Sequence, residues 1–446
     1  MTNLTHVVKR SGAVVKFKKE RISNAIFRAA VAVGGRDKKA ADKLADEVVE
    51  RLSKEYSEKN YPHIENIQDI VEKVLIKNGH SQVAKAYILY RNSNIERRKK
   101  KIQKASVPST SIPWPKIWKI LDWSIRHDLH NIESINKRVE KGEFPHIVHE
   151  SENAYADEVG MAAELISNRI DKLKMVLITG PSSSGKTTTT IKLEQHLNKA
   201  GFQFKMFAVD NYFYDLAMHP KDEFGDYDFE TPQALDLQLI NDHIMRLCHG
   251  EEVSIPYYDF KTGLRHPNST KMILKNNEIL LIDSLHGLYP EMTKSIQDEA
   301  KFKIYLEPLF QITDNSGKYL RWTDFRLIRR MLRDSIQRAY NPTQTLEHWH
   351  YVRASEVRHI IPYLHTADYI INSAMPYELP IYKARLGEDF IKWQKVYQHN
   401  KLKEDAAIRA ERINSFMQQI KGYNDESAIP KDSVIREFIA GSIHNY

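Results

Sequence analysis

One stretch of this 446-residue chain has the residue types and spacing to bind a phosphate chain. Gly180-Pro-Ser-Ser-Ser-Gly185-Lys186-Thr187 fits the pattern G-x-x-x-x-G-K-[ST]. The glycines let backbone N–H groups curl around phosphate oxygens at a helix N-terminus, where the helix dipole also favours an anion. Lys186 would reach the β- and γ-phosphates, and the Thr187 hydroxyl would ligate Mg²⁺. The pattern therefore predicts a nucleoside triphosphate site.

Two carboxylates follow apolar segments later in the sequence than this loop. Asp210 comes after Gln203–Val209, and Asp283 comes after Glu278–Ile282. If both segments are parallel strands, Asp210 ends a neighbouring strand and faces the γ-phosphate, where it would deprotonate or align a substrate hydroxyl. Asp283 has the position of a carboxylate that orients Mg²⁺ or its water shell. An isolated Asp at a strand end is also common as a turn former or helix cap.

Arginines recur at helical spacing further along the chain. The set consists of Arg326, Arg329, Arg330, Arg333 and Arg338. On a mobile lid, such arginines would close over the transferring phosphoryl group and neutralise its charge. A solvated basic helix face is the alternative, and the presence of the phosphate loop favours the lid.

The surrounding elements predict an α/β fold with a parallel sheet. Apolar strands alternate with longer helical segments, which is the pattern of crossover connections. The predicted strands are Met175–Thr179, Gln203–Val209, Glu278–Ile282, Phe302–Leu306 and Tyr369–Asn372. We expect a P-loop NTPase sheet with flanking helices at residues 172–380. A basic, proline-containing linker and helical segment at 99–171 precede it, and a helical tail at 381–446 follows.

The first 98 residues predict a separate small, mostly helical α/β module. Two short strands, at residues 7–10 and 14–17, flank a Ser-Gly turn. Helical patterns follow at residues 20–32, 38–54, 64–78 and 81–98.

The composition excludes several classes of protein. No apolar run approaches the roughly 18 residues of a membrane-spanning helix, and the first residues lack the apolar stretch of a signal peptide. We therefore expect a soluble, cytoplasmic protein without a membrane partner. The single cysteine, Cys248, excludes an internal disulfide and a zinc site of several cysteines. The net charge of +8 suits nucleotides, whereas the basic run at 97–101 is typical of a solvated helix end, so we expect no nucleic-acid partner.

Residues from about 172 to 373 resemble the uridine kinase/phosphoribulokinase family of P-loop kinases. The resemblance rests on the phosphate loop and on the stretches Asp210–Tyr214, Tyr227–Asp236, Ile255–Phe260 and Arg329–Asp334. Two further stretches, Ile282–Glu291 and Asp432–Phe438, are similar to the longer bacterial nucleoside kinases of that family.

This resemblance implies roles for individual residues. Asp210 would be the catalytic base, assisted by Lys186 and Arg333. Thr187 and Asp283 would serve Mg²⁺. The ATP phosphates would be held by Gly180, Ser182, Ser183, Ser184, Gly185, Lys186, Thr187, Thr188, Arg333 and Arg338. The residues in contact with the acceptor would be Asp210, Tyr212, Glu230, Tyr258, Phe260, Arg265 and Arg330. Among them, Glu230 and Arg330 would hold the ribose hydroxyls, and Tyr258 and Phe260 would line the nucleoside pocket.

The chain departs from the family pattern where uridine-cytidine kinases read the pyrimidine. Gly263 and Tyr340 stand at the positions of the base-reading His and Arg. Glu230 also replaces the usual Asp, and Asp283-Ser284 replaces a usual Glu-Gly. Because buried hydrogen-bonding groups discriminate strongly between substrates, losing two of them should change or relax specificity.

Residues 6–95 resemble an ATP-cone, an allosteric nucleotide-binding module best known from ribonucleotide reductases. The matching pieces are Val8–Gly12, Phe17, Arg21-Ile22, Ile67–Val71 and Gly79–Arg91. The resemblance implies a regulatory nucleotide held by Val8, Lys9, Arg10, Arg21, Ile22 and Lys85, and it implies a homo-oligomer. One cysteine cannot supply the radical site and reducing pair of a reductase.

Together these features predict an ATP- and Mg²⁺-dependent kinase of a nucleoside hydroxyl, regulated by ATP or dATP at the N-terminal module. A kinase of a non-nucleoside sugar or polyol is the alternative within the same class. A degenerate nucleotide sensor is the alternative outside it. The intact Lys186, Thr187 and Asp210 argue against a sensor, which has no need of a base.

Overall fold

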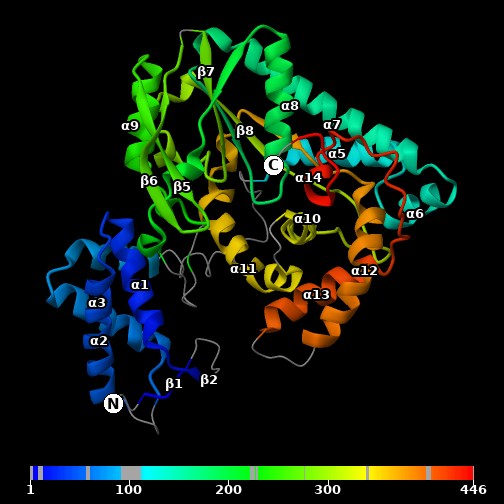
Figure 1. The fold of residues 1–446 in the computed structure, drawn as a ribbon. Coiled ribbons are helices and arrows are strands. Elements are labelled where there is room, and N and C mark those ends of the chain that lie inside the picture. Colours follow the sequence, from blue (N-terminus) through cyan, green and yellow to red (C-terminus); the bar gives the residue numbers. More distant parts are fainter. Residues whose placement is uncertain are drawn as a thin grey trace. The chain divides into compact units, whose positions relative to one another are not determined.

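The computed structural model describes residues 4–8, 14–56, 61–91, 112–220, 227, 230–275, 277–337, 341–397 and 403–444. The chain divides into two compact units (Figure 1). The first comprises Met1–Pro108, Tyr212–Leu237 and Pro256–Pro267, and the second comprises Ser109–Asn211, Gln238–Ile255 and Asn268–Tyr446.

The second unit is built on a five-stranded sheet in the order β4-β7-β3-β8-β9, in which every pair of neighbours is parallel. The strands are β3 (Met175–Thr179), β4 (Gln203–Met206), β7 (Glu278–Ser284), β8 (Lys301–Glu307) and β9 (Tyr369–Asn372). All five predicted strands are present, and the α/β prediction is confirmed. The central strand β3 is fully buried, as its uninterrupted Met-Val-Leu-Ile-Thr sequence requires in a sheet covered on both faces.

Helices surround this sheet. They are α5 (Trp114–Arg126), α6 (Ile132–Glu140), α7 (Phe144–Ser167), α8 (Lys186–Lys199), α9 (Leu237–Cys248), α10 (Trp322–Gln337), α11 (Pro342–His359), α12 (Glu378–Tyr397), α13 (Glu404–Met417) and α14 (Arg436–Ile439). Short 3₁₀ turns lie at Ile170–Lys172, Val209–Tyr212, Leu216–Met218, Pro232–Ala234, Pro290–Met292, Asp298–Ala300 and Ile361–Thr366. Helix α8 packs against α7 and the central strands, while α10 and α11 pack together and α12 pairs with α13 (Figure 1).

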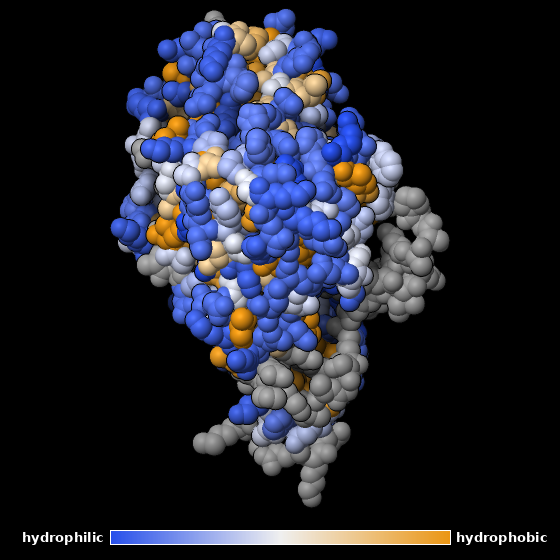
Figure 2. All heavy atoms as spheres, turned by 90° about the vertical axis from the view of Figure 1, so that its right-hand side faces the viewer, coloured by the Kyte–Doolittle hydropathy of each residue, from blue (hydrophilic) through white to orange (hydrophobic). Residues whose placement is uncertain are grey.

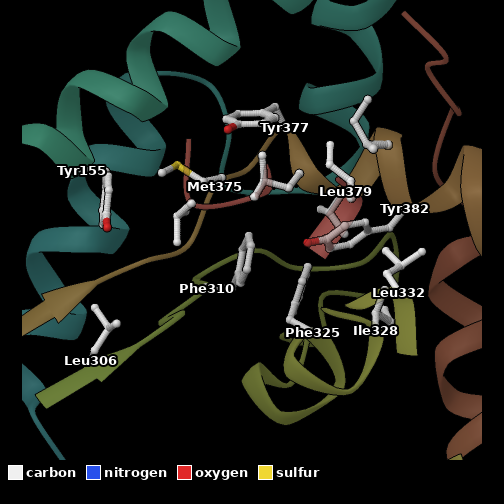
Figure 3. Close-up of a cluster of buried hydrophobic side chains, with 14 of the residues drawn as sticks. Tyr155, Leu306, Phe310, Phe325, Ile328, Leu332, Met375, Tyr377, Leu379 and Tyr382 are labelled. Carbon is white, nitrogen blue, oxygen red and sulfur yellow. The ribbon is translucent and has the colours of Figure 1, made fainter. Parts of the chain in front are cut away.

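One continuous hydrophobic core joins the helices at 114–167, the sheet and the C-terminal helices, since it runs from Leu129 to Ile439. Figure 3 shows part of it around Phe310 and Phe325, whose rings stack with centroids 3.7 Å apart. Tyr377 and Tyr382 close the same cluster from α12 and the turn before it (Figure 3). The tail therefore contributes to the core that supports the sheet.

The N-terminal module has its own core. Strands β1 (His6–Val8) and β2 (Val14–Lys16) pair antiparallel, and the helices α1 (Lys19–Ala32), α2 (Lys38–Glu55) and α3 (Ile64–Lys77) follow, with a further helix at 81–91. Their apolar faces form a separate cluster. The predicted strands and helices of this module are confirmed, except for residues 9–10 and 92–98, which lie outside the described residues.

A two-stranded sheet was not among the predicted strands. It consists of β5 (Val253–Asp259) and β6 (Leu264–Met272). The β6 sequence, Leu-Arg-His-Pro-Asn-Ser-Thr-Lys-Met, is polar and mostly exposed, so it carries no alternation of apolar residues by which a strand is recognised. The pairing of β6 with β5 is therefore a tertiary effect.

The surface drawn in Figure 2 is mainly hydrophilic, with hydrophobic residues in small separate patches. Among the residues that the structure describes, no helix is long and apolar enough to cross a membrane.

Candidate active site

The phosphate loop links the end of β3 to the start of α8, as the sequence predicted. A Cβ atom on Gly180 would collide with the Leu306 carbonyl oxygen of the neighbouring strand β8. Gly185 has a φ of +91°, in the left-handed region that favours glycine, and a Cβ there would collide with Val434. Both glycines are thus required by the fold of the loop itself. The first-turn N–H groups of α8 have no carbonyl partner within the helix and are available to an anion.

The two predicted carboxylates lie at the same edge of the sheet as the loop. Asp283 is in β7 and is paired in register with Ile178 of β3, two residues before Gly180. Asp210 lies in the 3₁₀ turn after β4 and is exposed. The prediction that the strand before Asp210 neighbours the loop strand is wrong, because β7 is inserted between β3 and β4. The strand also ends earlier, at Met206.

The electrostatics of this edge show that the predicted groups act on one another. Burial raises the pKa of Asp283 to about 6, and the negative charges of Asp210 and Glu437 act in the same direction. The charge of Lys186 opposes them. Lys186, Asp210 and Asp283 are therefore brought together, and they are joined by Glu437, a residue that the sequence analysis did not single out.

The donor set fits Mg²⁺ bound together with a nucleotide. Among the described residues, no three His, Cys, Asp or Glu side chains form a group that could hold a metal ion by themselves. Mg²⁺ is typically held by one or two carboxylates together with substrate phosphates and water. The exposed Thr187 hydroxyl and the Asp283 carboxylate supply such oxygens beside the loop. An ionised Asp283, disfavoured by burial and by two neighbouring negative charges, would be stabilised by a cation.

We expect Asp283→Asn to stabilise the nucleotide-free protein at pH 7.5. Because the folded-state pKa is raised above the ordinary value of 3.8 to about 6, the wild-type protein loses stability as the pH rises through this window. The difference corresponds to about 3 kcal/mol at most. Chemical denaturation at several pH values measures the free energy of unfolding. The difference between the variant and the wild type should increase between pH 4 and 6 and stay constant above pH 6. A difference in unfolding free energy that is the same at pH 4 and pH 7.5 would contradict the raised pKa of Asp283.

Arg326 and Arg329 of α10 differ from the prediction, since both are fully buried. Arg326 is paired with Glu356 and donates to the Ser182 carbonyl oxygen (3.2 Å). Arg329 donates from Nε to Glu378 (2.8 Å) and from Nη1 to the Ser184 carbonyl oxygen (3.4 Å). Neither the mobile lid nor the solvated face describes these two residues. Their hydrogen bonds to loop carbonyl oxygens brace the phosphate loop from inside the protein. Their acidic partners could not be identified from the sequence.

The remaining arginines of this helix are less buried. Arg330 donates to the Ser182 hydroxyl of the loop (3.1 Å) and to Asp334 (3.3 Å). Arg333 donates to Asp334 from Nε (3.1 Å) and from Nη2 (3.0 Å). Arg330 thus lies at the phosphate loop, although the resemblance implies contact with ribose hydroxyls. Arg338 and Tyr340 lie outside the described residues.

An aromatic cluster gathers the predicted nucleoside-pocket residues in the first unit. The Tyr258 ring lies 4.9 Å from Phe260 and 5.4 Å from Phe213, centroid to centroid, and it stacks with His219 at 6.2 Å. Phe260 is 62% exposed, so one face of this cluster is open to a ligand. Tyr212 is buried and Glu230 is partly buried.

Gly263 lies in the turn that joins β5 to β6, and Arg265 is the second residue of β6. Arg265 is paired with Asp236 (2.9 Å), and its backbone N–H donates to Asp215 (2.7 Å). Gly263 has a φ of +70°, and a Cβ on it would lie 2.7 Å from that of Leu216. A histidine at position 263 would therefore strain the backbone and clash, so this turn itself excludes the base-reading side chain.

The predicted regulatory residues are spread over the N-terminal module. Ile22 is buried in the module core, Arg21 is partly buried and Lys85 is exposed. The Val8 N–H donates to the Pro62 carbonyl oxygen (3.0 Å). Lys9 and Arg10 lie outside the described residues.

Comparisons with known proteins find matches to two parts of this chain. Residues 175–379 match the model of the phosphoribulokinase / uridine kinase family, and residues 5–95 match the ATP cone domain. A uridine kinase of Halobacterium salinarum is 25% identical over 161 residues, which cover 36% of this chain and 62% of that protein, less than two thirds of its length. A uridine kinase of Borrelia turicatae is 27% identical over 223 residues, or 49% of this chain and 97% of that protein.

Among solved structures, one described as a possible uridine kinase from Bacillus stearothermophilus is 20% identical, with a TM-score of 0.25 over 35% of this chain and 82% of that chain. The family matches cover both the loop-bearing unit and the N-terminal module. Two separate parts of the chain are thus similar to known domains, the N-terminal module to the ATP cone domain and residues 175–379 to the phosphoribulokinase / uridine kinase family.

Proposed function

We propose that this protein is an ATP- and Mg²⁺-dependent kinase that phosphorylates a hydroxyl group of a nucleoside-like acceptor. The observation that carries the proposal is the convergence of Lys186, Asp210 and Asp283 at the carboxyl edge of the sheet, beside a complete phosphate loop. A nucleotide-binding loop alone would also serve a sensor. A carboxylate in the position of Asp210 adds the group that accepts a proton from an attacking hydroxyl.

Each of these residues would have a separate role in phosphoryl transfer. The loop N–H groups and Lys186 would bind the phosphate chain and carry the charge that develops on the transferring group. Asp210 is exposed and would take the proton from the acceptor oxygen. Thr187 and Asp283 would hold Mg²⁺, which, when bound, neutralises phosphate charge and orients the γ-phosphoryl group. Arg330 and Arg333 would add positive charge near the loop.

A nucleoside is favoured as the acceptor because Phe260, the exposed ring of the cluster with Phe213 and Tyr258, offers an aromatic face to a flat ring. The turn at Gly263 has no room for a base-reading histidine. We therefore expect broader base specificity than that of a dedicated pyrimidine kinase. A sugar or polyol kinase would use the same loop and base, and it is the second candidate because the base-reading position is lost.

The direct experiment is an ADP-release assay with ATP and Mg²⁺ over purine and pyrimidine nucleosides, deoxynucleosides, sugars and polyols. We expect turnover that depends on a nucleoside and tolerates more than one base. Turnover only on sugars or polyols would replace the nucleoside assignment. If the protein binds ATP but no acceptor stimulates ADP release, the result would favour a nucleotide sensor without kinase activity.

The N-terminal module is proposed to regulate this activity through a bound nucleotide, in a homo-oligomer. Within the first compact unit, the guanidinium of Arg36 lies 4.0 Å from the centroid of the Tyr214 ring, and its Nη1 donates to the Gln233 carbonyl oxygen (3.0 Å). Arg265 lies over the same ring at 5.2 Å. Tyr214 and Gln233 belong to the acceptor segment, residues 212–237, which also carries the proposed acceptor residues Tyr212 and Glu230. A nucleotide that shifts the module would therefore act on this segment.

We expect full-length Arg36→Ala to keep its turnover without effector and to lose most of its response to dATP. The substitution removes the cation–π contact and the hydrogen bond that connect module and acceptor segment. Initial rates at fixed ATP with increasing dATP measure the response. The control is Arg28→Ala, on α1, the helix that precedes Arg36. An unchanged dATP response in Arg36→Ala would exclude this route.

A further inference from the structure

The C-terminal segment 432–438 docks on the helix that follows the phosphate loop. Asp432 is paired with Lys192 of α8 (2.9 Å). One turn earlier on α8, the Thr188 hydroxyl donates to Oε2 of Glu437 (3.0 Å). Thr188 is fully buried and Glu437 is 5% exposed, so the second contact is made inside the protein. The segment therefore reaches the first turn of α8 from a distance of about 250 residues in sequence.

The same segment also contacts the loop itself. Val434 occupies the space in which a Cβ of Gly185 would lie. The Phe438 ring lies 4.9 Å from the guanidinium of Arg329, which donates to the loop carbonyl oxygens. The Ser433 hydroxyl is within 2.9 Å of the Tyr377 hydroxyl and is also bonded to Glu152. The segment is thus held on its far side by α7 and by the turn before α12, and its near side packs against the phosphate loop.

The hydroxyl of Thr188 behaves differently from those of the next two threonines. Thr189 and Thr190 donate to the carbonyl oxygens four residues earlier, Gly185 and Lys186, at 2.8 Å each. The equivalent acceptor for Thr188 is the Ser184 carbonyl oxygen. That oxygen already accepts from the Ser373 hydroxyl (2.6 Å) and from Arg329. Glu437 therefore supplies a buried acceptor for the Thr188 hydroxyl, and this hydrogen bond helps to fix the rotamer of Thr188.

The position of Thr188 gives this contact a consequence for the nucleotide. The residue lies in the first turn of α8, directly after Lys186 and Thr187, where the helix N-terminus faces the phosphate chain. Glu437 is also close enough for its charge to act on Asp283. A group that fixes the first turn of this helix fixes the geometry of the N–H groups and of the Thr187 hydroxyl.

We propose that Glu437 is a positioning residue of the ATP site, which acts through the hydroxyl of Thr188, and that the C-terminal segment 432–438 is thereby an integral part of the nucleotide site. The proposal rests on the ATP-dependent activity proposed above. It assigns a role in nucleotide binding to a tail in which the sequence shows no chemistry.

The experiment compares Glu437→Ala, Glu437→Gln and Thr188→Val in the full-length protein. Affinity for a non-hydrolysable ATP analogue with Mg²⁺ is measured by calorimetry without acceptor, and KM for ATP and kcat are measured with acceptor. Loss of one buried hydrogen bond to a charged group predicts an increase of about tenfold in Kd and in KM for Glu437→Ala, with kcat changed less than threefold. Glu437→Gln keeps an acceptor oxygen and should stay within about twofold to threefold of the wild type.

The pair Thr188→Val and Glu437→Ala should be non-additive, so that the double variant binds the analogue no more weakly than the worse single variant. Glu140→Gln is the matched control, because its ion pair with Lys421 lies outside the segment 432–438 and is exposed; it should change Kd less than twofold.

Two results would overturn the proposal. The first is a Glu437→Ala variant with unchanged Kd and KM. The second is a Glu437→Gln variant that binds ATP as weakly as Glu437→Ala, together with a lowered melting temperature of both variants. This result would indicate that Glu437 has a structural role alone. Since the calorimetry needs no acceptor, weakened analogue binding in Glu437→Ala would support the proposal even if the protein transfers no phosphoryl group.

Discussion

Asp210→Asn should lower kcat by about a thousandfold while leaving the affinity for ATP within threefold of the wild type. The amide cannot accept the proton of the attacking hydroxyl, so transfer has to proceed without a base. ATP binding should persist, because the loop N–H groups and Lys186 hold the phosphate chain independently of this side chain. Removing one negative charge next to Lys186 and Asp283 would, if anything, favour binding of the anionic phosphates.

Steady-state kinetics with saturating acceptor and calorimetry with an ATP analogue measure the two quantities. Asp242→Asn is a suitable control, since this carboxylate lies on α9 and its ion pair with Arg246 is long (3.7 Å) and exposed. A kcat within tenfold of the wild type in Asp210→Asn would show that Asp210 is not the base.

Arg329→Met should destabilise the protein by about 3–5 kcal/mol. The guanidinium is fully buried and paired with Glu378, which is equally buried, so the substitution leaves an uncompensated carboxylate in the core. It also removes the hydrogen bonds to the Ser373 and Ser184 carbonyl oxygens that brace the phosphate loop. The loss of these braces should weaken ATP binding as well.

Urea denaturation measures the free energy of unfolding in Arg329→Met and in the double variant Arg329→Met/Glu378→Met. The double variant should recover part of the lost stability, because it removes the stranded charge, but not the ATP affinity. Arg385→Met is the control, since the pair with Glu426 is partly exposed and should contribute less than about 1 kcal/mol. A loss below 1 kcal/mol in Arg329→Met would contradict the role of Arg329 as a buried brace.

The elements that the sequence predicted well are those whose signal is local. Strands β3 and β9 have the predicted limits, because a short apolar run in an α/β pattern leaves few alternatives. The strand before Asp210 was predicted three residues too long, because apolar residues continue into the turn that carries the carboxylate. Strand β6 has no apolar alternation and depends on its partner β5.

The same distinction holds for the candidate site. The loop residues and the two carboxylates are adjacent to strands in sequence, so their positions follow from the topology of a parallel sheet. The arginines of α10 have identical chemistry in the sequence, and their different roles depend on partners far along the chain. Arg329 is buried because Glu378, 49 residues later, neutralises it. Glu437 was missed because one carboxylate among several in a charged tail gives no pattern that points to Thr188.

The central claim is that a phosphoryl group passes from ATP to a nucleoside hydroxyl at the edge of the sheet that carries Lys186 and Asp210. Incubation of the full-length protein with Mg²⁺, γ-³²P-labelled ATP and a nucleoside panel, followed by chromatographic separation, tests it most directly. We expect labelled nucleoside monophosphate with the wild type and almost none with Asp210→Asn. Label that stays in ATP or appears only as inorganic phosphate with every nucleoside would contradict it.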